Sequence, residues 1–229
     1  MRPTRIFPLG ENALTVEFGD YMSESLNNAA LNLAEHFDAN RFPGFIEAVP
    51  AIASATIFYK LYEVREAFPE FATAFEAVKY LVDSAADDLL DEPLNNERIV
   101  NVPVSFQADA ALDLQFIAEF SKLSVANVIE IFTSRIYRVY MLGFLPGFAY
   151  MGIVDEEIAV PRKASPRLIV PKGSVGIAGQ QTGIYPCESP GGWQVIGRTG
   201  MELTDALGGP DSFHFHPGDA VRFINVANQ

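Results

Sequence analysis

The sequence predicts an α+β protein of two domains: a small N-terminal α/β layer domain over residues 1–97, and a β-barrel domain with two covering helices over residues 98–229. Three observations support this fold class. Apolar patterns in the first part of the chain follow the order β-α-β-β-α. An acidic segment broken by a proline comes next. Beyond residue 136, glycine and proline interrupt short apolar runs every few residues, as in a closed or partly closed barrel.

The N-terminal domain begins with residues 13–19, whose alternation of apolar and polar side chains predicts a strand. Ser23 is a candidate N-cap for an amphipathic helix that ends near Asp38. Residues 44–50 and 55–61 are typical of two short strands, and a second amphipathic helix follows them. The apolar residues of the two helices recur at helical spacing: Leu26, Ala30, Leu33 and Phe37 in the first, and Phe71, Ala74, Phe75, Val78, Leu81 and Val82 in the second.

The boundary between the domains is predicted at residues 83–97, DSAADDLLDEPLNNE, because the segment is acidic and polar and contains a proline. Residues 99–106 alternate and predict the first strand of the second domain. Two helices are expected next, over about 110–122 and about 125–136, with Ser124 as the N-cap of the second. The apolar face of the first of these helices is expected to consist of Leu112, Phe116 and Phe120.

Charge and composition exclude several classes of function. The chain carries a net charge of −13, and residues 1–97 alone contain 6 Lys and Arg against 17 Asp and Glu. Such a surface repels nucleic acid and anionic membranes, so neither is expected as a main partner. The apolar runs are shorter than the roughly 20 residues of a membrane span, and the start lacks an apolar signal-peptide core. A single cysteine, Cys187, fits a reducing compartment, so we expect a cytoplasmic protein.

A basic, glycine-rich segment is the candidate binding site. Residues 143–200 contain 11 of the 17 glycines and 6 of the 15 prolines, and residues 161–200 contain five basic residues against one acid, Glu188. Glycines let a ligand approach backbone N–H groups, and arginine binds phosphate or carboxylate through two hydrogen bonds. The expected substrate or phosphate ligands are Arg162, Arg167, Lys172 and Arg198, with Ser174, Gln180, Thr182, Tyr185 and the Gly191 and Gly192 backbone as neutral contacts. The alternative is that these residues form barrel turns, with Trp193 in the core.

The common signatures of phosphate-binding loops, hydrolase nucleophiles and metal sites are missing from the sequence. Lys172-Gly173-Ser174 lacks the earlier glycine of a phosphate-binding loop, and residues 173–176 do not have the spacing of a hydrolase nucleophile elbow. His214 and His216 are predicted to share one face of a strand, but no further ligands at suitable spacing suggest a metal site. No residue is an evident general base, so the catalytic residues stay unassigned.

Four stretches carry a family resemblance: VYMLGFLPGFAYMG (139–152), PRKASPR (161–167), VPKGSVGIAGQQTGIYPCESPGGWQVIGRT (170–199) and HPGDAVRF (216–223). The chain resembles the KipI-like, allophanate hydrolase subunit 1 family, whose members are regarded largely as the B subunit of an ATP-dependent 5-oxoprolinase. The resemblance covers nearly the whole chain.

This resemblance implies a cyclophilin-like barrel domain and a hydrolase subunit that is inactive alone. It also implies two partner subunits, one KipA-like and one of the LamB/YcsF type. The assembled enzyme would open 5-oxo-L-proline to L-glutamate with ATP hydrolysis, using ATP with Mg²⁺ at a site shared with a partner.

Two departures from the family pattern concern the exact activity. The chain reads SFQADAALDL over residues 105–114, where relatives have a Tyr-Gly pair and a Gly-Pro-Asp-Leu stretch, and it has Phe132 where relatives have histidine. The alternative function is a KipI-type regulator that inhibits a histidine kinase, binding through the acidic domain or an apolar barrel face. A prolyl isomerase is suggested by barrel analogy alone, which does not fix function.

Overall fold

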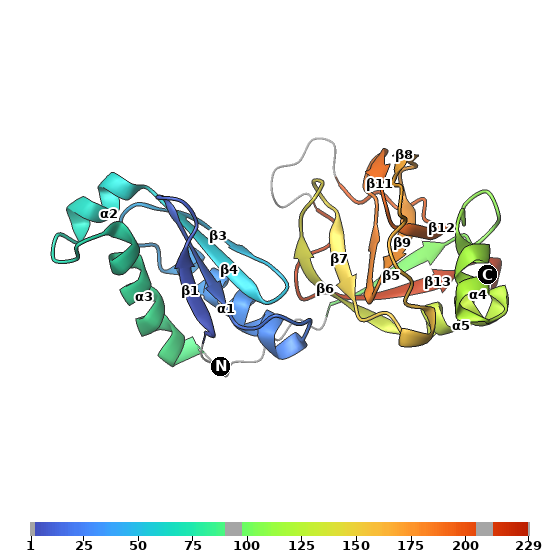
Figure 1. Cartoon of the computed structure of the whole chain (residues 1–229), viewed down its shortest axis with the longest axis horizontal. Coiled ribbons are helices and arrows are strands. Elements are labelled where there is room, and N and C mark those ends of the chain that lie inside the picture. Colours follow the sequence, from blue (N-terminus) through green and yellow to red (C-terminus); the bar gives the residue numbers. More distant parts are fainter. Residues whose placement is uncertain (1–2, 90–97, 205–212, 229) are drawn as a thin grey trace. The chain divides into compact units, whose positions relative to one another are not determined.

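The computed structural model describes residues 3–89, 98–204 and 213–228 of the chain (Figure 1). The chain divides into two compact units, Met1–Asn95 and Asn96–Gln229, each with its own hydrophobic core. Residues 90–97 of the predicted boundary segment lie outside the described residues. Residues 83–89 of that segment are not a linker, because they form the end of a long helix.

The first unit is a four-stranded antiparallel sheet in the order β1-β2-β4-β3, covered by helices. Helix α1 packs against β3 and β4, and α3 packs against β2 and α1. The elements are β1 (Arg5–Pro8), β2 (Ala13–Glu17), α1 (Glu24–Ala39), β3 (Phe45–Pro50), β4 (Ser54–Tyr59), α2 (Leu61–Ala67) and α3 (Ala74–Leu89). Three predicted strands and two predicted helices are therefore present, as β2, β3, β4, α1 and α3.

Two elements of the first unit, β1 and α2, are not predicted by the sequence. Strand β1 has only four residues and leaves no alternating pattern of useful length. Helix α2 has seven residues and buries only Val64 among them, so no apolar stripe marks it in the sequence. Ser23 occupies the predicted N-cap position, but its hydroxyl contacts Ser25 Oγ at 2.9 Å and caps no backbone N–H of the helix.

The second unit is a seven-stranded sheet in the order β12-β9-β10-β7-β6-β13-β5. Its strands are β5 (Ile99–Val104), β6 (Ile136–Leu142), β7 (Ala149–Gly152), β9 (Ser174–Ala178), β10 (Gln181–Ile184), β12 (Gln194–Arg198) and β13 (Ala220–Asn225). Ser105, just after β5, pairs with Arg198 at the end of β12 through two backbone hydrogen bonds of 2.8 and 3.0 Å. This bridge brings the two end strands together and nearly closes the sheet, which confirms the predicted barrel.

The last strand of the barrel lies inside the sheet. β13 pairs in parallel with β5, the first strand of the unit, and antiparallel with β6. A separate two-stranded sheet joins β8 (Arg167–Val170) to β11 (Ser189–Gly191) beside the barrel (Figure 1).

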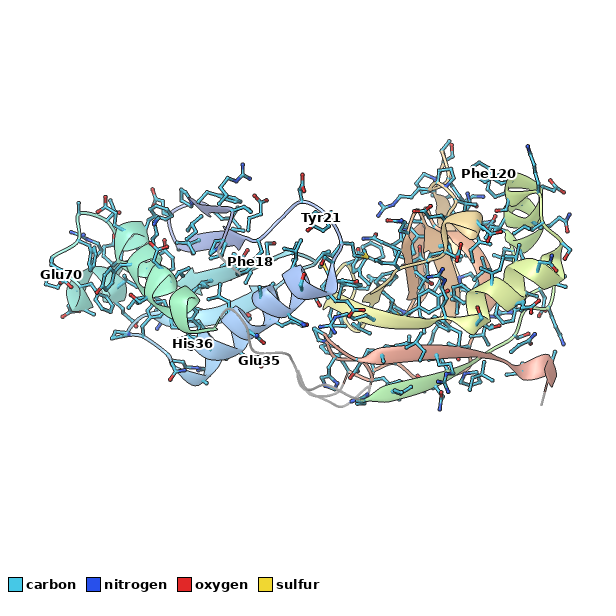
Figure 2. All side chains as sticks on the ribbon, turned by 90° about the horizontal axis from the view of Figure 1, so that it is seen from below. Phe18, Tyr21, Glu35, His36, Glu70 and Phe120 are labelled. Carbon is cyan, nitrogen blue, oxygen red and sulfur yellow. The ribbon has the colours of Figure 1, made fainter. Side chains whose placement is uncertain are left out.

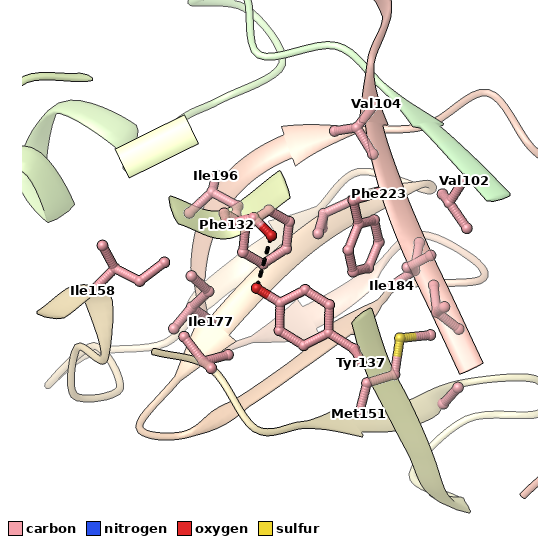
Figure 3. Packing of buried hydrophobic residues seen from close by; sticks show 14 of the residues in the cluster. Val102, Val104, Phe132, Tyr137, Met151, Ile158, Ile177, Ile184, Ile196 and Phe223 are labelled. Atoms are coloured by element: carbon pink, nitrogen blue, oxygen red, sulfur yellow. Dashed lines mark hydrogen bonds between the residues drawn. The ribbon is translucent and has the colours of Figure 1, made fainter. Parts of the chain in front are cut away.

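Aliphatic side chains and a cluster of aromatic rings fill the barrel core (Figure 3). Phe132 is completely buried, and its ring centroid lies 4.8 Å from that of Phe223 and 5.1 Å from that of Tyr137. The Tyr137 hydroxyl donates a hydrogen bond of 2.9 Å to the Phe132 carbonyl oxygen, so a buried polar group is satisfied. The position where relatives are expected to carry histidine is thus a core position in this chain.

Two helices cover the barrel as predicted, α4 (Leu114–Ser121) and α5 (Val125–Ser134). The Ser124 hydroxyl accepts a hydrogen bond of 3.1 Å from the Asn127 N–H, which confirms the predicted N-cap of α5.

The predicted apolar face of α4 is wrong. Leu112, Phe116 and Phe120 are 43%, 42% and 54% exposed, and Figure 2 labels Phe120 on the outer side of the helix. The buried residues are Leu114, Ile117 and Ala118, at the i, i+3, i+4 spacing of one helix face. The helix begins at Leu114, later than predicted, and the sequence offers two apolar faces between which spacing alone cannot choose.

No helix in the described parts of the chain combines the length and apolar character that a membrane crossing requires.

Candidate functional site

A pocket of about 230 Å³ lies in the second unit beside the two-stranded sheet of β8 and β11. Its walls consist mainly of aromatic rings, from the loop before β7, from β7 itself, and from the residues just after β10 and just before β12. A single arginine, two prolines and the Gly191-Gly192 backbone complete the lining. The residues that line the pocket are Phe144, Phe148, Tyr150, Arg162, Pro166, Tyr185, Pro190, Gly191, Gly192 and Trp193.

Phe148 organises the aromatic walls. Its ring contacts those of Tyr150, Tyr185 and Trp193 at centroid distances of 4.9, 5.3 and 5.5 Å, all in edge-to-face geometry. Phe148, Tyr185 and Trp193 are buried, whereas Phe144 is 61% exposed. Interlocked edge-to-face pairs fix the orientation of each ring, so the pocket has a defined shape before a ligand enters.

Tyr185 is one of the two tyrosines, with Tyr150, that bring a polar hydroxyl to this aromatic wall. Burial raises the pKa of its phenol, so the hydroxyl keeps its proton at neutral pH and can donate a hydrogen bond. The adjoining Gly191 has no room for a side chain, because a Cβ atom there would lie 2.4 Å from the Tyr185 hydroxyl oxygen. The glycine therefore allows the backbone of β11 to approach the phenol closely.

Arg162 brings positive charge to the pocket. Its guanidinium carbon lies 5.8 Å from the centroid of the Trp193 ring, within the range of a cation–π contact. Arg162 is exposed, and within residues 3–89, 98–204 and 213–228 no carboxylate forms an ion pair with it. An anionic ligand group can therefore pair with this guanidinium without displacing a carboxylate of the described chain.

The other predicted cations are paired with carboxylates of the same unit. Arg167 makes two hydrogen bonds of 2.7 Å with Asp113, and Lys163 contacts the same carboxylate at 3.1 Å. Lys172 contacts Glu202 at 2.6 Å. Arg198 lies 3.5 Å from the carboxylate of Asp109. These residues do not line the pocket, and the structure does not bring the four predicted cations together.

The neutral residues of the prediction are also divided. Ser174 and Thr182 are buried, and the Thr182 hydroxyl donates to the Gly176 carbonyl at 2.9 Å. Gln180 is exposed in the turn between β9 and β10. Of the ten predicted ligands, the pocket contains Arg162, Tyr185, Gly191 and Gly192. The role of the remaining six in binding stays a prediction.

Sequence reasoning misses three of the five aromatic residues of the pocket. Phe144, Phe148 and Tyr150 come from the stretch GFLPGFAY, which stands out in the sequence for its glycines and for the family resemblance. Trp193 is buried, at 5% exposed, and is also part of the pocket wall, so it is both a core residue and a residue of the candidate site.

His214 and His216 lie before β13 and not on a strand. Arg98 donates to the His214 carbonyl oxygen and lies 3.1 Å from His216 Nδ1.

Asp113 is a buried carboxylate that accepts several hydrogen bonds from residues near the pocket. It is 5% exposed and accepts bonds from Arg167, from Lys163 and from the Val195 N–H, the last at 2.7 Å. Burial by itself disfavours the charged form, but the hydrogen bonds from Arg167, Val195 and Lys163 outweigh it and hold the pKa of Asp113 below its ordinary value. The carboxylate is therefore ionised at neutral pH.

This lowered pKa predicts acid sensitivity of the second unit. The stabilisation from Asp113 is fully present above its unfolded-state pKa of about 4 and is lost as pH falls through its lower folded-state pKa. We expect the free energy of unfolding of the wild type to fall more steeply below about pH 4 than that of Asp113→Asn. Urea titrations at several pH values, followed by the fluorescence of the single tryptophan, Trp193, measure this difference. Parallel pH profiles would contradict the assignment.

Comparison with known proteins gives a consistent result. Residues 4–213 match the family described as carboxyltransferase domain, subdomain C and D. The chain is 40% identical over 226 residues to a Bacillus subtilis protein named as the B subunit of 5-oxoprolinase, covering 98% of this chain and 94% of that protein. It is 34% identical to a protein of the same name from Escherichia coli O157:H7, covering 98% and 97%.

A solved structure supports the fold. The crystal structure of TTHA0988 superposes with a TM-score of 0.78 at 34% identity and covers 93% of this chain. The chain spans only 39% of that longer protein.

Proposed function

This chain belongs to the family of the carboxyltransferase domain, subdomain C and D, and on that premise we propose that it is the cytoplasmic B subunit of an ATP-dependent 5-oxoprolinase. In that assembly it helps to open 5-oxo-L-proline to L-glutamate. Two relatives that bear the name of the 5-oxoprolinase B subunit, at 40% and 34% identity and nearly full coverage, support this role.

The pocket around Trp193 is the observation that carries the proposal. Its volume of about 230 Å³ is smaller than the roughly 300–1,000 Å³ of sites for drug-sized ligands, and it suits a small metabolite. The substrate, 5-oxo-L-proline, is a five-membered lactam with one carboxylate. Aromatic walls contact the apolar face of the ring, and Arg162 pairs with the carboxylate.

The lactam amide needs polar partners in the same pocket. Amide resonance makes the carbonyl carbon a poor electrophile, and negative charge develops on its oxygen during attack. A protonated Tyr185 and the Gly191-Gly192 backbone are groups of the pocket that can stabilise this oxygen. No described residue that lines the pocket is a carboxylate or histidine, so we propose that the general base comes from a partner.

The residues of this pocket do not fit a nucleoside triphosphate. Arg162 is the one basic residue among those that line it, and Arg167, Lys172 and Arg198 contact Asp113, Glu202 and Asp109. A triphosphate with Mg²⁺ needs several donors and metal-binding oxygens. We therefore assign ATP and its Mg²⁺ mainly to the two partner subunits, the KipA-like one and the one of the LamB/YcsF type.

Replacing Arg162 tests the proposed substrate site. Loss of one charge-assisted hydrogen bond, worth about 1.5–3 kcal/mol, is expected to weaken 5-oxo-L-proline binding by at least about tenfold in Arg162→Ala. Titration followed by Trp193 fluorescence measures binding, and ATP-dependent glutamate release by the chain mixed with its two partners measures activity. Arg222→Ala, which removes an exposed arginine of β13 outside the pocket, serves as the control.

Two results would count against this proposal. Unchanged binding and glutamate release in Arg162→Ala would remove Arg162 from the substrate site. Recovery of a histidine kinase in place of a KipA-like protein, in a pull-down with the intact chain, would favour the KipI-type inhibitor instead.

A further inference from the structure

The segment that carries two pocket residues has no regular secondary structure. Residues 161–166 lie between the short helix Glu156–Ile158 and β8, and they place Arg162 and Pro166 on the pocket. Two hydrogen bonds hold the backbone of the segment: the Lys163 N–H donates to the Gly192 carbonyl at 2.7 Å, and the Gln194 amide donates to the Pro161 carbonyl at 3.1 Å. An irregular segment with so few backbone bonds needs further support to keep a defined position.

Asp113 provides that support from outside the pocket. It precedes α4 and its side chain caps no N–H of that helix. The backbone N–H of Asp113 donates to the Val195 carbonyl, and its carboxylate accepts from the Val195 N–H, both at 2.7 Å. Asp113 is therefore fixed to β12 two residues beyond Trp193, and from there it holds the side chains of Lys163 and Arg167.

We infer that Asp113 is a positioning residue for the pocket: by binding Lys163 and Arg167, it fixes the intervening segment so that Arg162 and Pro166 stay beside Trp193. This role rests on the proposed use of the pocket for the lactam. Asp113 does not line the pocket, so it acts on the substrate only through this segment.

Electrostatics and positioning predict opposite effects when the charge is removed. Asp113→Asn deletes a negative charge close to the pocket, which by itself strengthens the binding of an anionic ligand. It also breaks the paired hydrogen bonds with Arg167 and frees the segment, which weakens binding because displacement of a binding group by about 1 Å is costly. The direction of the change therefore distinguishes a positioning residue from a carboxylate that acts only through its charge.

The test compares Asp113→Asn with Asp155→Asn in the complete chain. Asp155 is a matched control, because it also pairs with an arginine, Arg135, and accepts a backbone N–H, from Glu157 at 2.9 Å, without contacting residues 161–167. In the assembled enzyme, Asp113→Asn is expected to raise the KM for 5-oxo-L-proline by about tenfold with kcat changed less, whereas Asp155→Asn leaves both unchanged. Binding of the lactam by Asp113→Asn as tight as, or tighter than, that of wild type would overturn the inference.

A second readout does not depend on the substrate. If Arg162 and Pro166 leave the Trp193 ring, acrylamide quenches Trp193 fluorescence more strongly in Asp113→Asn than in wild type, and equal quenching overturns the inference. Failure of the wild-type protein to bind 5-oxo-L-proline would overturn the proposed function, and quenching would still decide the role of Asp113. Arg167→Lys, which keeps the charge but loses the two-bond geometry, is expected to change KM and quenching in the same direction if Asp113→Asn does not fold.

Discussion

Gly173→Ala is expected to destabilise the second unit by about 3 kcal/mol or more. Gly173 has a φ of +78°, and a Cβ atom there would lie 2.1 Å from the Thr199 carbonyl oxygen. The backbone cannot move away easily, because the Gly173 N–H donates to the Tyr185 carbonyl at 2.8 Å and the Gly173 carbonyl accepts from the Thr199 N–H at 2.9 Å. Urea unfolding followed by Trp193 fluorescence gives the loss in free energy of unfolding.

Gly179→Ala separates the two causes of this effect. Gly179 also has a positive φ, +59°, but no atom lies within 4 Å of a Cβ placed there. Only the backbone penalty applies, so a loss of about 1 kcal/mol is expected. Equal losses in the two variants would show that the contact with Thr199 relaxes without cost.

Phe132→Ala is expected to destabilise the second unit by about 3–5 kcal/mol. The Phe132 ring is fully buried among Tyr137, Phe223 and Phe106, so its removal leaves a cavity that these rings cannot fill without losing their own contacts. The same urea measurement applies. In Phe120→Ala, which shortens a phenylalanine that is 54% exposed on α4, the loss is expected to stay below about 1 kcal/mol. A similar loss in both variants would contradict the core role of Phe132.

The two departures from the family pattern have different consequences. Phe132 does not line the pocket, so a phenylalanine in place of histidine removes no pocket residue from this chain. The stretch 105–114, in contrast, contains Ser105 of the barrel closure, Asp109 beside Arg198, and Asp113. The second departure therefore lies in the stretch that closes the barrel and that holds residues 161–166 beside the pocket.

Local patterns explain which parts of the fold were predictable. β2, α1 and α5 were predictable because alternation, helical spacing and a capping serine are properties of a few neighbouring residues. The face of α4 was not predictable in the same way, because both of its faces are apolar and only the tertiary contacts show which one is buried. β1 and α2 are too short to leave a periodic signal.

The candidate site was only partly predictable for a different reason. The sequence indicated a basic, glycine-rich segment, and four of the ten ligands predicted in it do line one pocket. The partners of the other cations are distant in sequence: Asp113 lies 54 residues before Arg167, Asp109 lies 89 before Arg198, and Glu202 lies 30 after Lys172. Composition within the segment carries no information on such long-range ion pairs, so it overestimates the charge available to a ligand.

The placement of β13 between β5 and β6 affects how this unit is made. A ribosome releases β5 and β6 long before residues 220–225, yet these two strands have no hydrogen bonds to each other in the finished sheet. Their inward valines and tyrosines stay without the neighbour that covers them until β13 arrives and inserts between them. Barrel assembly during synthesis is therefore a late event. A nascent chain that stalls before Ala220 leaves one edge of β5 and one edge of β6 without hydrogen-bond partners, and these edges are open to chaperones and proteases.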